Sequence, residues 1–126
     1  EKAIDLAVIG PEDPLFAELP RPAPAFRWNQ DIVVETPPRS VVLATADGGV
    51  TQAFRVGTNA WGVQVHPEVT VDIARRWAAR SPDDPAAAAA RRARESAAPR
   101  LAEVWWPFAR AFARRVHAAS GLGRGG

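Results

Sequence analysis

A histidine and a glutamate separated by one proline are the residues of this sequence best suited to acid–base chemistry. His66, Pro67 and Glu68 follow an alternating segment, Trp61 to Val65. On an extended backbone, positions i and i+2 project to the same side, so imidazole and carboxylate are predicted to lie together. A carboxylate beside an imidazole fixes its tautomer and stabilises the imidazolium formed when the ring accepts a proton. The pair predicts a general base; the alternative interpretation of His-Pro-Glu at a strand end is a surface turn.

The sequence offers this base no obvious nucleophile. It contains no cysteine, whereas a thiol is the side chain that a neighbouring base most readily activates. No serine lies in a G-x-S-x-G elbow; the serines are Ser40, Ser81, Ser96 and Ser120. Without cysteine there is no disulfide and no thiolate zinc site. We expect neither a metal ion nor a cofactor.

The elements that must position the pair are strands. Three β-branched or alternating runs with short connections predict a meander, comprising Val41–Thr45, Gln52–Val56 and Trp61–Val65. Asp47-Gly48-Gly49 is the turn signal between the first two. Ile4–Ile9 predicts an earlier strand, and the proline-rich segment after it a loop. Two more extended candidates are Ala25–Trp28 and Ile32–Glu35.

After Glu68 the hydrophobic period changes from two to 3.6, which predicts helices. Thr70 is a good N-cap for a helix ending near Arg80. A second helix is expected from Pro85 to about Ala98, and Pro99 is expected to open a third with one apolar stripe. That stripe contains Leu101, Val104, Trp105, Phe108, Phe112 and Val116. The third helix should end around Ser120-Gly121, leaving residues 121–126 as a disordered tail.

Composition and charge place the chain among soluble globular proteins. It has 126 residues, 47% hydrophobic and 24% charged, which fits one domain. No long apolar run or signal peptide is present, so we expect a cytoplasmic protein without membrane contact. Residues 1–68 carry a net charge of −4 and residues 69–126 one of +6. The basic half predicts a solvated helix face, with a phosphate-binding surface as the alternative. The chain begins at Glu1 and contains no Met, which favours a longer parent.

The string from Gln52 to Glu68, QAFRVGTNAWGVQVHPE, resembles the signature of class I glutamine amidotransferases. It matches that family's Q-A-F-R strand and its G-x-Q-F-H-P-E segment, with Val65 in place of the usual Phe. The resemblance extends to Asp13-Pro14-Leu15-Phe16, which is similar to the family's D-P-L-F, and to Leu43–Asp47, which is similar to its L-A-x-S-D. Residues 1–120 therefore resemble the C-terminal portion of such a domain.

The resemblance implies an α/β fold, namely the C-terminal half of a flavodoxin-like three-layer sandwich with an antiparallel meander and C-terminal helices. In that family the sheet is largely parallel, with helices on both faces. His66 and Glu68 would be two members of a Cys-His-Glu triad. Trp28, Asn29 and Gln30 occupy the place of the family's W-H-G beside the glutamine site, although Asn29 and Gln30 depart from it. The alternative for Trp28 is simple core packing.

The implied function is hydrolysis of glutamine to glutamate and ammonia, with glutamine as substrate. The implied partner is an N-terminal half that carries the cysteine, in the same parent chain or in a second chain. An ammonia-accepting synthase is a further possible partner. The chain alone is predicted to be inactive. The alternatives are a non-catalytic remnant that serves binding or assembly and, more remotely, an arginine-rich nucleic-acid binder.

Overall fold

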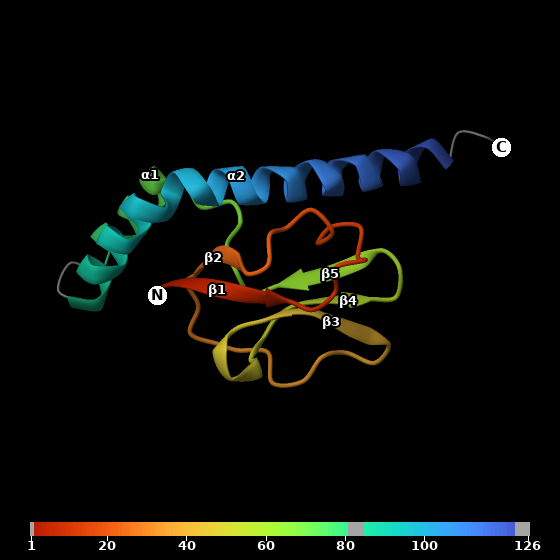
Figure 1. Cartoon of the computed structure of the whole chain (residues 1–126), viewed down its shortest axis with the longest axis horizontal. Helices are drawn as coiled ribbons and strands as arrows, with labels where there is room; N and C mark the ends of the chain where they lie inside the picture. Colours follow the sequence, from red (N-terminus) through yellow and green to blue (C-terminus); the bar gives the residue numbers. More distant parts are fainter. Residues whose placement is uncertain (1, 81–84, 123–126) are drawn as a thin grey trace.

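The computed structural model describes residues 2–80 and 85–122, which form one antiparallel sheet and two helices. The strands are β1 (Lys2–Val8), β2 (Ala23–Arg27), β3 (Ser40–Thr45), β4 (Thr51–Val56) and β5 (Ala60–Val63). They lie in the order β2-β1-β3-β4-β5. Figure 1 shows helix α2 crossing above this sheet.

The predicted meander is present as β3, β4 and β5, paired antiparallel in sequence order. A short 3-10 turn, Asp47–Gly49, joins β3 to β4, and Gly48 and Gly49 both have positive φ. Glycine adopts that conformation without steric cost, which explains the turn signal. Gly62 has a different reason for lacking a side chain, because a Cβ there would overlap the Phe54 ring on the neighbouring strand. Packing against Phe54 therefore accounts for the glycine at position 62 of the Gln52–Glu68 string.

The parallel strands implied by the family resemblance are not among the described strands, all of which pair antiparallel. The reason is local connectivity. A parallel neighbour requires a crossover of a dozen or more residues, usually a helix, whereas β2, β4 and β5 each return directly beside the preceding strand. The segment Ile32–Glu35, expected to be extended, lies in the loop between β2 and β3 and forms no strand. Its Val34 is 90% exposed.

The sheet curls so that the segment after β5 reaches the opposite edge. The Gln64 amide donates to the Gln52 carbonyl of β4 at 2.7 Å, and the His66 amide donates to the Phe26 carbonyl of β2 at 2.8 Å. Val65, between them, is buried. This crossing brings His66 next to Phe26, which lies near the end of β2 and forty positions earlier in the chain.

After Glu68 the described residues form two helices, whereas the sequence predicts three. Thr70 caps α1 (Val71–Ala79), with its side-chain oxygen accepting from the Ile73 amide at 3.3 Å. The helix α2 (Pro85–Leu122) runs through Pro99, so the predicted boundary there is wrong. A proline inside a helix removes one hydrogen bond and bends the helix without having to end it. Figure 1 shows the first part of α2 running in a different direction from the rest.

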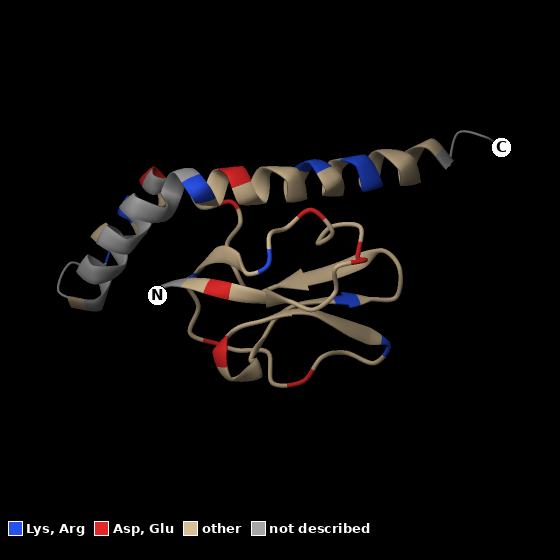
Figure 2. Cartoon of the chain, viewed as in Figure 1, with Lys and Arg blue, Asp and Glu red and all other residues tan. Residues whose placement is uncertain are grey.

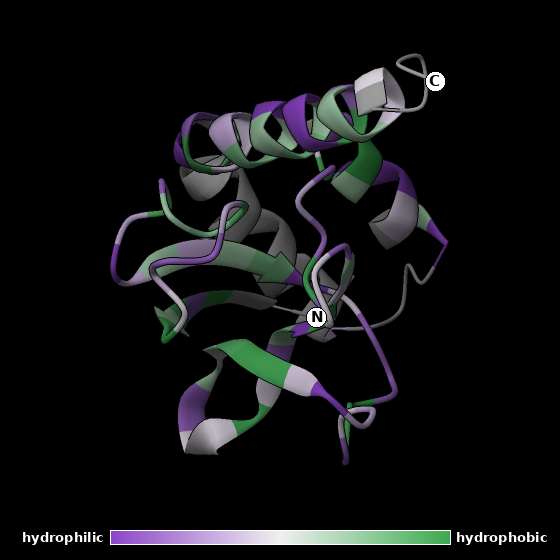
Figure 3. Ribbon diagram, turned by 90° about the vertical axis from the view of Figure 1, so that its right-hand side faces the viewer, coloured by the Kyte–Doolittle hydropathy of each residue, from purple (hydrophilic) through white to green (hydrophobic). Residues whose placement is uncertain are grey.

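The core lies between α2 and the concave side of the sheet. The largest fully buried apolar side chains come from the strands and the loop after β1, and are Leu6, Leu15, Phe16, Phe26 and Leu43. Helix α2 adds Leu101, Val104 and Trp105, three members of the predicted stripe. The Trp105 indole donates to the Pro24 carbonyl at 2.9 Å, which fixes the helix on β2. Figure 3 shows hydrophobic and hydrophilic positions alternating along α2.

The end of the predicted stripe and the predicted tail differ from expectation. Phe112 and Val116 are each 49% exposed, and Phe112 borders a wide hollow between α2 and residues 67–70. Figure 1 shows that the end of α2 extends past the sheet. The helix also continues through Gly121 to Leu122, into the segment expected to be disordered. Residues 123–126 lie outside the described residues.

Charge follows the division seen in the sequence. Figure 2 shows basic residues along α2 and acidic residues mainly around the sheet and its loops. The Arg115 guanidinium donates to the Thr58 carbonyl at 3.1 Å and lies 5.7 Å from the centre of the Trp61 ring. Arg114 lies 3.9 Å from the Glu18 carboxylate. These arginines thus contact the sheet domain itself. None of the described helices combines the length and apolar character that crossing a membrane requires.

Candidate functional site

The structure brings His66 and Glu68 into direct contact in the turn that follows β5. His66 Nδ1 lies 2.8 Å from Glu68 Oε1. The Val69 amide donates to the His66 carbonyl at 3.3 Å, closing a turn around Pro67. The imidazole is 30% exposed and the carboxylate 57%. The pair is therefore held by backbone geometry and remains open to an approaching group.

The second nitrogen of the ring is also engaged. His66 Nε2 lies 2.9 Å from the main-chain carbonyl oxygen of Trp28. A carbonyl oxygen can only accept, so Nε2 is the donor in this contact. The nitrogen that would face a nucleophile is thus occupied by the backbone of the loop after β2.

That loop is tied to the His66 segment by a short polar chain. The Asn29 amide donates to Gln64 Oε1 at 3.1 Å and also to the Asp31 carbonyl. Arg27 Nε donates to Asn29 Oδ1 at 2.8 Å. Asn29, a predicted substrate-binding residue, therefore holds the loop in place through Gln64, which the sequence presented as part of the motif but not as a site residue.

The other two predicted substrate-binding residues differ in their placement. Trp28 is partly buried against the core, and both its carbonyl and its ring face the site. Gln30 is exposed and lines neither of the hollows described below. The structure thus brings Trp28 to His66, places Asn29 one contact away and leaves Gln30 outside.

Aromatic rings surround the imidazole. The Trp77 ring, from α1, lies edge-on to His66 with 5.1 Å between centroids and to Trp28 with 5.3 Å. A pocket of about 350 Å³ opens here, lined by Trp28, His66, Trp77 and Arg80. Sequence reasoning missed Trp77 and Arg80 as site residues. Trp77 lies in α1 and Arg80 directly follows that helix, yet nothing in the sequence says that either residue meets His66.

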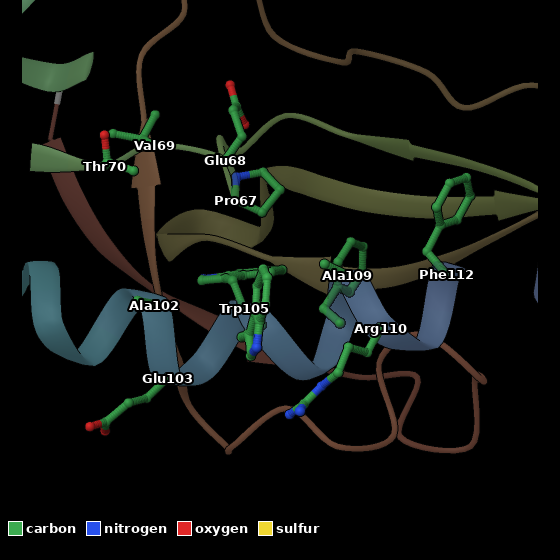
Figure 4. A pocket seen from close by; sticks show the side chains of 12 residues that line it. Pro67, Glu68, Val69, Thr70, Ala102, Glu103, Trp105, Ala109, Arg110 and Phe112 are labelled. Atoms are coloured by element: carbon green, nitrogen blue, oxygen red, sulfur yellow. The ribbon is translucent and has the colours of Figure 1, made fainter. Parts of the chain in front are cut away.

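A larger and more apolar hollow of about 980 Å³ lies on the other side of the turn. It runs between residues 67–70 and α2. Figure 4 shows Glu68, Glu103 and Arg110 directing their charged ends away from the space between turn and helix. Trp106, which also lines it, is 65% exposed. Glu68 therefore stands at the border between this apolar hollow and the pocket around His66.

A second carboxylate contact, between Asp13 and Arg55, is buried on the carboxylate side. Asp13, in the loop after β1, is 3% exposed. Its carboxylate lies 2.6 Å from Arg55 Nη1 and accepts from the Leu15 amide at 2.9 Å and from the Trp61 indole at 3.2 Å. This cluster fastens the loop after β1 to β4 and β5.

The arrangement around His66 is suited to proton transfer. The chain has no cysteine. Among residues 2–80 and 85–122 no group of three or more His, Cys, Asp or Glu side chains could hold a metal ion. The chemistry available here is that of a histidine oriented by a carboxylate.

Comparison with known proteins gives a match in structure. No protein-family model matches the sequence, and no curated protein gave a significant match. Among solved structures, the chain is similar to the crystal structure of a glutamine amidotransferase from Thermotoga maritima, with 23% sequence identity and a TM-score of 0.74. The match covers 90% of this chain and 49% of that chain, so this chain spans about half of the solved protein's length. At the level of its sheet and helices, the chain therefore has the α/β fold of a glutamine amidotransferase.

Proposed function

We propose that this chain is the C-terminal portion of a class I glutamine amidotransferase domain and contributes the histidine and glutamate of its triad. The observation that carries the proposal is the 2.8 Å contact between His66 Nδ1 and Glu68 Oε1. The motif around them and the fold similarity support the same assignment. The complete domain would be a flavodoxin-like three-layer sandwich, with the remaining strands and helices supplied by another segment.

In this mechanism His66 acts as base and then as acid. A cysteine thiol from the other segment gives its proton to His66 and attacks the γ-carboxamide carbon of glutamine. The tetrahedral intermediate collapses, the C–N bond breaks and the imidazolium donates its proton to the leaving ammonia. A γ-glutamyl thioester remains. His66 then takes a proton from water, which attacks the thioester, and glutamate and the thiol are released. Glu68 orients the ring throughout.

The contact between His66 Nε2 and the Trp28 carbonyl bears on this mechanism. Because Glu68 occupies Nδ1, the thiol must use Nε2, which here donates to Trp28. Assembly with the cysteine-bearing segment would exchange this carbonyl for the thiol. The chain alone is therefore inactive for two reasons, since it lacks the nucleophile and its base is already engaged.

Reconstitution tests the proposal. The chain is combined with the cysteine-bearing segment of its own parent domain, and ammonia release from glutamine is measured with a coupled dehydrogenase. The combined protein should produce ammonia, and neither the chain alone nor a combination carrying His66→Ala should do so.

Two results would contradict the proposal. Ammonia release by the chain alone, abolished by His66→Ala, would show that no cysteine is needed. Release by the combined protein at an unchanged rate after His66→Ala would remove the base from the reaction.

A second candidate function is non-catalytic binding or assembly. It is favoured by the apolar hollow along α2, with Trp106 65% exposed, and by the absence of cysteine. Under this alternative the reconstituted domain forms a stable complex without glutaminase activity.

A further inference from the structure

The pocket beside His66 contains a positive charge that the proposed triad does not use. Trp77 lies in α1, and Arg80 follows that helix directly, with its amide donating to the Trp77 carbonyl at 3.1 Å. Both residues line the pocket, together with Trp28 and His66. Arg80 therefore borders the same small space as the two tryptophans and the imidazole.

Arg80 differs from the two arginines of the preceding helix, α1. Arg75 lies 3.7 Å from the Asp72 carboxylate, and Arg76 donates to the Asp72 carbonyl at 3.4 Å. For Arg80, the described part of the chain supplies no carboxylate partner. The pocket lining contains no acid either, because Glu68 turns toward His66 Nδ1 and the other side of the turn.

These properties suit a small molecule with a carboxylate. A guanidinium presents parallel N–H donors that match the two oxygens of a carboxylate. Indole rings pack against aliphatic groups and add little conformational entropy cost. The volume of about 350 Å³ lies at the lower end of the range of roughly 300–1,000 Å³ typical of small-molecule sites. The pocket is therefore matched to a compact amino acid in charge and in size.

We propose that Arg80 binds the α-carboxylate of the substrate amino acid and makes the pocket selective for a free carboxylate. With the α-carboxylate at Arg80 and the aliphatic chain against the pocket-facing sides of Trp28 and Trp77, the carboxamide lies next to His66. This inference rests on the proposed function, whose site it completes with a specificity-determining residue outside the sequence motif.

Calorimetric titration of the whole chain tests it without requiring turnover. The probes are L-glutamine and L-glutaminamide, in which an uncharged amide replaces the α-carboxylate. The wild-type chain should bind glutamine about tenfold more tightly than glutaminamide, which is the size of effect expected for one charge-assisted pair. Arg80→Gln should weaken glutamine binding by that factor and leave glutaminamide binding unchanged.

Two further variants control for general effects. Arg76→Gln removes one positive charge from the same helix outside the pocket and should leave both affinities unchanged. Arg80→Lys keeps the charge without the paired donors and should give an intermediate affinity for glutamine. Urea unfolding of each variant separates a binding defect from a folding defect.

The proposal is overturned if the wild-type chain does not bind glutamine, if it binds both probes equally, or if Arg80→Gln and Arg76→Gln weaken binding alike. These outcomes are distinct from failure of the proposed function. Arg80-dependent binding by a chain whose reconstituted domain releases no ammonia would overturn the catalytic function alone. Undiminished ammonia release at subsaturating glutamine after Arg80→Gln would overturn the role of Arg80 alone.

Discussion

Two carboxylate contacts in this molecule have similar lengths and differ in every other respect. Asp13 and Arg55 approach to 2.6 Å, and His66 and Glu68 to 2.8 Å. The Asp13 side chain is 1% exposed and accepts from three different groups, whereas the Glu68 side chain is 57% exposed and contacts His66. The first is a buried structural junction, and the second is an open site.

The difference shows how to separate structural from functional polar residues within one motif. A carboxylate whose lone pairs are filled by backbone and side-chain donors is committed to the fold, because removing it leaves those donors unpaired. A carboxylate that orients one ring and is otherwise hydrated is free to act in chemistry. Arg55 and Glu68, both matches to the amidotransferase signature, therefore serve different purposes.

Asp13→Ala should produce the largest loss of stability. It would leave Arg55 without its carboxylate and the Leu15 amide and Trp61 indole without an acceptor. Breaking a buried pair by removing one partner typically costs about 3–5 kcal/mol. Urea unfolding followed by tryptophan fluorescence measures the loss. Glu12→Ala, which removes an exposed neighbouring acid, is the matched control and should change stability by less than about 0.5 kcal/mol. Equal effects for the two variants would show that the Asp13 cluster is not a junction.

Gln52 is buried like Asp13, but its side chain lacks the hydrogen-bond partners that the Asp13 carboxylate has. Its side chain is fully buried, and neither its amide nitrogen nor its amide oxygen has a hydrogen-bond partner among the described residues. Burial of an unpaired amide costs about 1–3 kcal/mol. Gln52→Met, which keeps the side chain's length, should therefore raise the free energy of unfolding by about 1 kcal/mol. A loss of stability would mean that the amide is paired in solution, for example through an internal water.

The sequence predicts a structural feature well when the interacting residues lie within a few positions of each other along the chain. The meander and the contact between His66 and Glu68 follow from local alternation, turn residues and the i, i+2 spacing, all visible within a few positions. The cap at Thr70 is equally local. Pro99 shows the limit of local rules, because packing of Leu101, Val104 and Trp105 on the sheet holds a continuous helix where propensity predicts an end.

The rest of the site depends on contacts between distant positions. Trp28 and His66 meet because the curled sheet brings the end of β2 to the segment after β5. Trp77 joins them only once α1 has packed there. Periodicity places Trp77 on an apolar helix face, but it does not specify which surface that face covers. Arg80 was missed for the same reason.

Glu68→Gln should have the smallest effect on stability and the most specific effect on function. Exposed ion pairs contribute about 0–1 kcal/mol, so the variant's urea midpoint should lie close to that of the wild type. The amide still reaches His66 but cannot stabilise an imidazolium as a carboxylate does. Ammonia release by the reconstituted domain should fall by about 10²-fold or more, the range that positioned acid–base groups supply.

The control for this variant is Glu103→Gln, an exposed acid on α2 that lines the apolar hollow with its charge directed away from it (Figure 4). It removes the same charge near the same turn and should leave the rate unchanged. Equal rates for wild type and Glu68→Gln would remove Glu68 from the mechanism. A loss of stability as large as that of Asp13→Ala would instead make the two contacts equivalent. Asp13→Ala should therefore lower the free energy of unfolding, whereas Glu68→Gln should lower the rate of ammonia release and leave the free energy of unfolding nearly unchanged.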